Sequence, residues 1–280
     1  MFELSWRGGA TEARLRKRRP GIDELPWGTL DLGRYPELHA IEARRIWSNG
    51  VFTEYASAAA FSALTTAMLS CGAPVDLVAA CADMVVDELF HVELSARLTM
   101  ELGGAVPLEF DLAKIAPIAS PGARPLLAAA ELAITTSCVS ESLSVPAMAR
   151  SRALSDEPLV RAVLDRLVED EGPHARLGFW FLDWAAPQLD DGELAQLARL
   201  AEDTIEVYAP LWQDVRACES CPLPRGLGGH DDLGRQALRR AVEASIAGPL
   251  ARHGIVLDPA RVARLASDAA PSLRGAICSG

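Results

Sequence analysis

Residues 88–91 read Glu-Leu-Phe-His and residues 171–174 read Glu-Gly-Pro-His, so the chain carries a Glu-x-x-His motif twice. Residues three apart lie on the same face of an α-helix, and in each copy both side chains can therefore point at one place. Alternate steps of four and three residues along each segment give a mainly apolar row with the motif in its middle. Two of the five histidines of the chain thus lie on predicted core faces.

Long stretches of Ala, Leu, Glu and Arg surround the motifs, and alternating strand patterns are almost absent. Glycine and proline divide these stretches into helices that we expect at about residues 37–69, 75–102, 126–154 and 159–186. Short turns join the first two helices and the last two, whereas residues 105–125 contain four prolines and form a long crossover. Two antiparallel helical hairpins joined by one crossover are the topology of a ferritin-like four-helix bundle, so the sequence predicts this all-α fold.

The bundle is expected to be one of three parts of the chain. Residues 1–37 are rich in proline and glycine and predict an extended arm, in which the basic stretch 14–19 would be solvated. Residues 38–186 form the bundle, and residues 187–280 form a helical extension with helices at about 190–217, 235–253 and 258–269. An apolar stripe at helical spacing is expected to pack on the bundle, or in part against a second copy in a homodimer: Leu238, Val242, Ile246 and Leu250.

Composition excludes several classes of protein. Half of the residues are hydrophobic and the net charge is −11, which argues against a disordered chain and against a nucleic-acid-binding face. No uninterrupted apolar run is long enough to span a membrane. Six cysteines are too few for a disulfide scaffold, so a reducing cytoplasm is expected. Cys218 and Cys221 form a lone C-x-x-C, and the glycine-rich stretch 226–229 lacks the strand and lysine of a phosphate loop.

Two further carboxylates fall on the predicted seams. Glu54 lies on the first helix and Glu141 on the third, and antiparallel packing brings Glu54 level with Glu88 and Glu141 level with Glu171. A buried carboxylate must be paired or coordinated. Four carboxylates and two imidazoles at one level would repel one another unless cations were present, so we predict two divalent metal ions.

This pattern resembles the ligand set of the ferritin-like di-iron carboxylate superfamily over about residues 38–186. The resemblance implies one metal ion at Glu54, Glu88 and His91. It implies a second ion at Glu141, Glu171 and His174. The bridging pair is either Glu88 with Glu141 or Glu88 with Glu171. Oxygen-rich ligands favour iron or manganese, so two iron ions are expected, with manganese or a mixed pair as alternatives.

The resemblance implies a non-haem di-iron oxidase or oxygenase that uses O2 and an external electron donor to oxidise a small organic substrate. Iron oxidation and storage, or peroxide removal of the manganese-catalase type, are the alternatives. Long segments outside the bundle favour a discrete enzyme, and Leu167 stands where the arylamine N-oxygenases of this superfamily carry an additional histidine, so arylamine N-oxygenation is not predicted. Four small residues near the ligands are expected to leave room for the substrate: Ala58, Ser95, Cys138 and Gly178.

Four other features carry expectations about local structure. Pro173 lies inside the second motif and predicts a kink in the fourth helix. Glu131 is about 15 Å along its helix from Glu141, so we expect it at the end of the bundle or paired with an arginine. Tyr55 is expected to be half-buried, and the segment 230–232, His-Asp-Asp, is expected to be a solvated turn.

Overall fold

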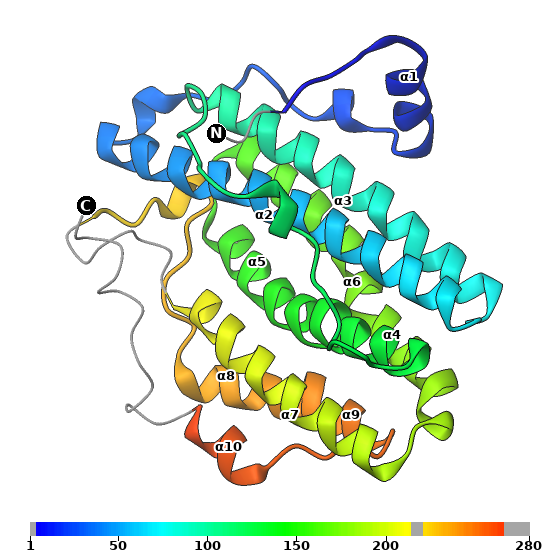
Figure 1. Ribbon diagram of the computed structural model, residues 1–280. Coiled ribbons are helices and arrows are strands. Elements are labelled where there is room, and N and C mark those ends of the chain that lie inside the picture. Colours follow the sequence, from blue (N-terminus) through cyan, green and yellow to red (C-terminus); the bar gives the residue numbers. More distant parts are fainter. Residues whose placement is uncertain (1–3, 214–220, 266–280) are drawn as a thin grey trace.

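The computed structural model describes residues 4–213 and 221–265, and within these ranges the chain forms helices and no strand (Figure 1). The first hairpin consists of α2 (Glu37–Ser70) and α3 (Val75–Glu101). The second consists of a long helix made of α4 (Pro125–Ala133), η4 (Ile134–Glu141) and α5 (Ser142–Leu154), followed by α6 (Pro158–Ala185). The prediction of an all-α bundle is confirmed.

Glycine and proline end the helices close to the predicted positions. Gly72 has a φ of 70° between α2 and α3, and Pro74 comes directly before α3. Gly103 and Gly104 follow α3 with φ values of 106° and 101°, which favour glycine because it has no Cβ. Pro158 occupies the first turn of α6, where a missing N–H costs nothing.

The third helix of the bundle contains a π-helix, η4, whose last residue is Glu141. The fourth helix, α6, continues through Pro173 without a break, and the kink expected there stays a prediction. Ser137 of η4 bridges η4 to α6, since its hydroxyl accepts a hydrogen bond from Gly178 N (2.7 Å) and donates one to the carbonyl of His174. This contact holds the π-helix against α6 at the level of the second motif.

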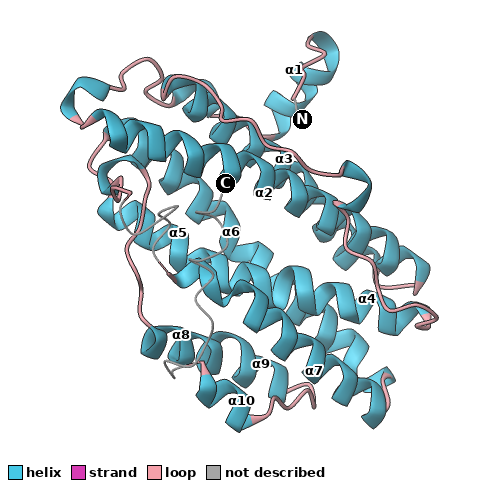
Figure 2. Ribbon diagram, turned by 60° about the vertical axis from the view of Figure 1, so that its left-hand side comes forward, coloured by secondary structure: helices cyan, strands magenta, loops and turns pink. Residues whose placement is uncertain are grey.

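The helices after the bundle lie together on one side of it, next to α4 and α5 (Figures 1 and 2). They are α7 (Asp191–Tyr208), η6 (Ala209–Trp212), α8 (Arg235–Val242), the π-helix η8 (Glu243–Ala247), α9 (Gly248–Ala251) and α10 (Pro259–Arg264). We expected α7 to continue to residue 217, but it ends at Tyr208 because Pro210 converts the next turn to a 3-10 helix. Predicted helical residues 214–217 and 266–269 lie outside the described residues.

The apolar stripe of the extension packs within the same chain. Its four residues are at most 5 % exposed and belong to the apolar core that also contains residues of α2, α3, α4 and α6: Leu238, Val242, Ile246 and Leu250. The described part of the extension therefore packs on the bundle. The alternative, in which part of the stripe contacts a second copy of the chain, is not needed to cover it.

The N-terminal segment is not an extended arm, and part of its basic stretch contacts the bundle. It contains α1 (Gly9–Arg18), η1 (Ile22–Glu24) and η2 (Leu32–Arg34). Arg16 forms an ion pair with Glu93 of α3, and Arg19 forms one with Asp87 of α3. The expectation was wrong because the outer face of α3 is acidic and attracts the basic stretch, which the sequence pattern of the stretch alone does not indicate.

The glycine-rich stretch 226–229 is a packing loop. Trp47 of α2 donates its indole N–H to the carbonyl of Leu227 (2.9 Å). A Cβ on Gly228 would lie 2.8 Å from the Trp47 ring, and one on Gly226 would lie 2.5 Å from Tyr35. The glycines are there because the backbone approaches aromatic rings closely, which agrees with the rejection of a phosphate loop.

The helical run Pro125–Leu154 is long enough and apolar enough on average to cross a membrane, although it contains no uninterrupted apolar stretch of that length. However, 83 % of its most apolar window is buried inside the fold, as expected for a core helix of a bundle. Cys221 is half-buried, whereas Cys218 lies outside the described residues, so the structure does not describe the C-x-x-C pair as a whole.

The close approach of α6 and η4 predicts that Gly178→Ala destabilises the protein. A Cβ at this position would lie 2.5 Å from Cys138 Sγ and 2.9 Å from the carbonyl of Ala133, so the helices must move apart. We expect a loss of roughly 1–3 kcal/mol in the free energy of unfolding, measured by urea denaturation.

Gly50→Ala is the matched control, because Gly50 is also inside a helix but a Cβ there would meet no atom within 4 Å. Alanine is the better helix former, so this variant should gain about 0.5–1 kcal/mol. Equal effects of the two substitutions would show that helix contact at Gly178 is not the constraint.

Candidate metal centre

The four helices of the bundle bring the predicted carboxylates and histidines to one buried place. Glu54 comes from α2, Glu88 and His91 from α3, and Glu171 from α6. One ligand atom of each of these four residues lies within 4.8 Å of the others, so together they could hold a metal ion. Three of the four side chains are buried and Glu54 is half-buried.

Glu88 and Glu171 each present both carboxylate oxygens to the two histidines. His174 Nδ1 lies 2.9 Å from Glu88 Oε1 and 2.9 Å from Glu171 Oε2. His91 Nδ1 lies 3.1 Å from Glu171 Oε1 and 3.8 Å from Glu88 Oε2. The two Glu-x-x-His motifs therefore face one another, and the centroids of the imidazole rings are 5.8 Å apart.

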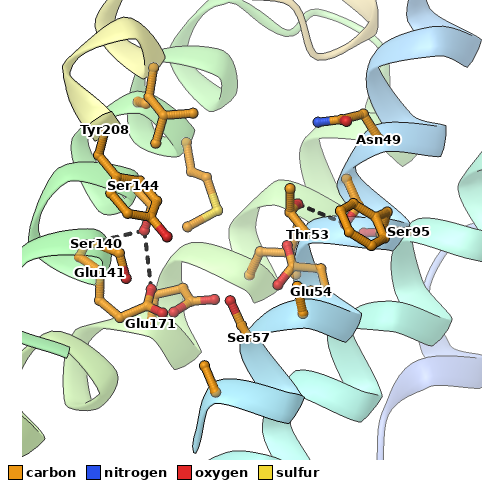
Figure 3. A pocket seen from close by; sticks show the side chains of 18 of the residues that line it. Asn49, Thr53, Glu54, Ser57, Ser95, Ser140, Glu141, Ser144, Glu171 and Tyr208 are labelled. Atoms are coloured by element: carbon orange, nitrogen blue, oxygen red, sulfur yellow. Dashed lines mark hydrogen bonds between the residues drawn. The ribbon is translucent and has the colours of Figure 1, made fainter. Parts of the chain in front are cut away.

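The remaining two carboxylates lie farther out in the site. Glu54 Oε2 is 3.7 Å from His91 Nδ1. Glu141 is buried at the end of η4, and its Oε2 accepts a hydrogen bond from Ser144 (3.1 Å). Figure 3 shows Glu54 on one side of the pocket and Glu141 with Glu171 on the other. Glu141 and His174 lie beside the group of four, and the group itself does not include them.

An aspartate lies behind each histidine and comes from the opposite motif. Asp170 Oδ2 is 3.4 Å from His91 Nε2, and Asp87 Oδ2 is 3.4 Å from His174 Nε2. A histidine that donates its outer N–H to a carboxylate keeps its other nitrogen available as a ligand. Sequence analysis missed these residues, although each stands directly before a motif glutamate. The sequence pattern does not indicate that each aspartate contacts the histidine of the other motif. This crossed pairing results from the antiparallel packing of α3 and α6.

Unpaired polar atoms gather at this site. Among the described residues, six buried side-chain nitrogen or oxygen atoms lack a hydrogen-bond partner, and five of them belong to the two motifs: Glu88 Oε1 and Oε2, His91 Nδ1, Glu171 Oε2 and His174 Nδ1. A buried polar atom without a partner costs about 1–3 kcal/mol. These atoms are all metal-ligand types and lie close together, with His174 Nδ1 2.9 Å from Glu88 Oε1 and from Glu171 Oε2, so the residues fit bound cations.

Burial and mutual charge shift the pKa values of the group in a consistent way. Burial raises the pKa of Glu54 to about 8, and burial with the charges of Glu171 and Glu88 raises that of Glu141 well above its usual range. Burial alone lowers the pKa of His174, but contacts with Asp87 and the motif glutamates raise it to about 12.

The same opposing effects of burial and charged neighbours act on the pKa values of His91 and Glu171. Burial lowers the pKa of His91, but its contacts with Asp170 and Glu171 outweigh burial and raise it well above 6.5. Burial raises the pKa of Glu171, but contacts with the two histidines lower it overall. Protons on the two histidines and on the carboxyls of Glu54 and Glu141 can therefore supply the compensating positive charge that was expected from metal ions alone.

A cavity of about 580 Å³ opens onto the carboxylates, and its lining includes Glu54, Glu141 and Glu171 (Figure 3). Segments outside the bundle complete its wall. The crossover contributes Lys114, Ile115 and Pro117, and the C-terminal extension contributes Tyr208, Leu211, Gly228 and His230. This volume lies in the range of pockets that bind small organic molecules.

The small residues that form the cavity differ from those predicted. Ser95 lines it, but Ala58, Cys138 and Gly178 do not. Gly178 and Cys138 are instead in the contact between α6 and η4. The residues that do leave room lie on α2 and include Gly50, Ser57 and Ala60. Helical spacing indicates how far along its helix each of these residues lies, but not which face of that helix borders the cavity.

Two residues expected in ordinary surroundings have specific contacts. Glu131 is buried and accepts hydrogen bonds from Ser120 N (2.7 Å) and Gln196 Nε2 (2.6 Å), so its partners are these groups and not the arginine given as one of two alternatives. His230 is 5 % exposed and lines the cavity, so of the segment 230–232, expected to be a solvated turn, only Asp232 is exposed. Its neighbour Asp231 pairs with Arg150 (2.7 Å), which holds the loop against α5.

Tyr208 is a cavity residue that sequence analysis missed. Burial and the nearby charge of Glu141 raise the pKa of its phenol, while a hydrogen bond with Ser140 lowers it. Its position depends on the end of α7, which the sequence pattern placed later in the chain. Tyr55, by contrast, is half-buried as expected and is not part of the cavity wall.

Comparisons with protein-family models and with curated proteins find no match to this chain. The helical bundle and its buried Glu and His residues are compatible with a ferritin-like di-iron site.

The raised pKa values predict that metal binding releases protons. A divalent cation must displace protons from the histidines and from Glu54, so its affinity should rise with pH. The contribution of Glu54 ends near pH 8, whereas that of His174 continues above it. Titration of the metal-free protein with Mn²⁺ in a weakly buffered solution containing a pH indicator would measure the release. Glu54→Gln should release fewer protons, because its side chain holds none to exchange. The same release from both proteins would contradict the assignment of a protonated Glu54.

Proposed function

We propose that this protein is an oxidoreductase with a carboxylate-bridged pair of iron or manganese ions. Glu88 and Glu171 would bridge the two ions, with His91 and Glu54 completing one half and His174 and Glu141 the other. The observation that carries the proposal is the convergence of five unpaired buried ligand atoms beside a cavity of about 580 Å³.

The geometry favours Glu88 with Glu171 as the bridging pair. Each carboxylate lies between the two histidine Nδ1 atoms and presents one oxygen to each of them. Glu141 does not take this position, since one of its oxygens accepts a hydrogen bond from Ser144 on the next turn. Nitrogen and carboxylate ligands without thiolate favour iron or manganese over softer metals.

When bound, such a pair supplies redox chemistry with O2. In an oxygenation, one oxygen atom goes to the substrate and the other to water, and an external donor supplies two electrons. The residues of the chain hold the ligands in place, keep the histidines oriented through Asp87 and Asp170, and enclose the substrate. Ser140, Ser144 and Tyr208 provide hydroxyl groups beside Glu141 that can orient a substrate or hold a proton.

The cavity favours an enzyme that oxidises an organic substrate over an iron store or a peroxide-removing enzyme. Iron or peroxide needs only a narrow path to the metal, whereas this cavity has the volume of a small organic molecule. Most of its wall comes from the bundle helices, and the crossover and the C-terminal extension complete it with residues that include Ile115, Tyr208 and His230. We therefore propose a small organic substrate, oxidised beside Glu54, Glu141 and Glu171.

The first test is metal stoichiometry and its dependence on the two histidines. Protein reconstituted anaerobically with Fe²⁺ should bind two ions per chain, measured by elemental analysis after gel filtration. His91→Ala and His174→Ala should each lower occupancy, because each removes a ligand of one half. His253→Ala is the matched control, since His253 lies outside the site near Asp183. Equal occupancy in all three variants would contradict the assignment of the ligands.

The second test separates the candidate functions. On exposure to air, an oxidase or oxygenase should consume O2 in proportion to its two ions and then stop until electrons and substrate are added. Accumulation of many ferric ions per chain in a large shell would identify a store. Rapid breakdown of hydrogen peroxide by the manganese form, without organic substrate, would identify a peroxide-removing enzyme.

A further inference from the structure

The two halves of the site are supported in different ways. Asp170, behind His91, accepts a hydrogen bond from Arg166 (2.7 Å), which is four residues earlier on the same helix. Asp87, behind His174, is held by Arg19, which follows α1 and lies outside the bundle. One aspartate is thus oriented from within α6, and the other depends on a segment that comes from the N-terminal region.

Arg19 is well placed to orient Asp87. Its side chain is 12 % exposed, and its Nε donates to Asp87 Oδ1 while Asp87 Oδ2 faces His174 Nε2 at 3.4 Å. The same guanidinium also donates to the carbonyl of Asp83 (3.0 Å), one turn earlier on α3. With both oxygens of Asp87 engaged in this way, the carboxylate points at His174.

Ionic contacts hold α1 in place. None of its residues is buried, so it has no apolar face packed on the bundle. Arg16 pairs with Glu93, a carboxylate that is 3 % exposed and also lies 3.0 Å from Arg97. The docking of α1 therefore depends on neutralising acidic groups of α3, two of which lie within one turn of the ligands Glu88 and His91.

We infer that Arg19 is a positioning residue for the His174 half of the metal centre, and that docking of α1 and metal binding strengthen one another. The inference rests on the proposed metal centre. If Arg19 orients Asp87 toward His174, its loss weakens the ion at that half. Because coupling between two binding events is reciprocal, the bound ion then strengthens the docking of α1 by the same factor.

The first experiment measures Mn²⁺ affinity in Arg19→Gln, with free Mn²⁺ read from its electron paramagnetic resonance signal. Loss of an outer partner of a metal-bound histidine typically costs 10–100-fold in affinity, so we expect about tenfold for one of the two ions. Arg18→Gln is the matched control, because Arg18 is 52 % exposed and only approaches Asp83 at 3.8 Å. It should change affinity by less than about twofold, as expected for an exposed pair.

A double-mutant comparison identifies the half that responds. In a His91→Ala background the remaining ion depends on His174, and Arg19→Gln should weaken it. In a His174→Ala background the same substitution should have no effect. Arg166→Gln should show the reverse pattern, since it supports Asp170 and His91. Equal effects of Arg19→Gln in the two backgrounds would overturn the inference.

The second experiment follows α1 directly by hydrogen exchange. Mn²⁺ should slow exchange of the amides of α1 in the wild-type protein, and Arg19→Gln should remove this difference without unfolding the bundle. Exchange in α1 that is the same with and without Mn²⁺, together with unchanged affinity in Arg19→Gln, would overturn the inference. A wild-type protein that binds two ions but does not oxidise organic substrates would contradict the proposed enzyme alone. A wild-type protein that binds no Mn²⁺ would contradict both.

Discussion

Burial of like charge at the centre of a helical bundle is the constraint on which the rest of this structure depends. Glu88 and Glu171 are at most 2 % exposed and face two buried imidazoles. Such a group is stable only where positive charge compensates it, whether from protons or from cations. The raised pKa values of the histidines indicate that protons serve in the metal-free chain. Exchange of protons for cations then links metal binding to the stability of the fold.

The charges around the centre alternate from the inside outwards. Carboxylates lie at the middle, histidines face them, and Asp87 and Asp170 lie behind the histidines. An arginine lies beyond each aspartate, with Arg166 beside Asp170 and Arg19 beside Asp87. Each layer orients the one inside it, because a carboxylate held at one oxygen presents the other in a defined direction. The N-terminal segment is thereby part of the support of the centre.

The two hairpins resemble one another in sequence but not in shape. α2 is a regular helix through Glu54, whereas the corresponding helix of the second hairpin contains the π-helix η4 that ends at Glu141. π-helical turns are frequent at functional sites. Here η4 contacts α6 through Ser137 and stands beside Tyr208 and the cavity. The asymmetry leaves Glu141 hydrogen-bonded to Ser144, while Glu54 approaches His91.

The amino-acid pattern alone was enough to predict the bundle helices and the Glu and His residues of the candidate site. Helical spacing and the Gly and Pro residues at the turns are local signals, so the four bundle helices begin and end close to the predicted residues. The two Glu-x-x-His motifs and Glu54 could be identified because their side chains interrupt apolar rows at matching depths. Only the tertiary structure decided which groups surround them. The crossed pairing of Asp87 with His174, the docking of Arg19, the π-helix before Glu141 and the burial of His230 all depend on contacts between segments far apart in the chain. Such contacts depend on how side chains of different helices fit together, and the periodicity of any one segment does not contain that information.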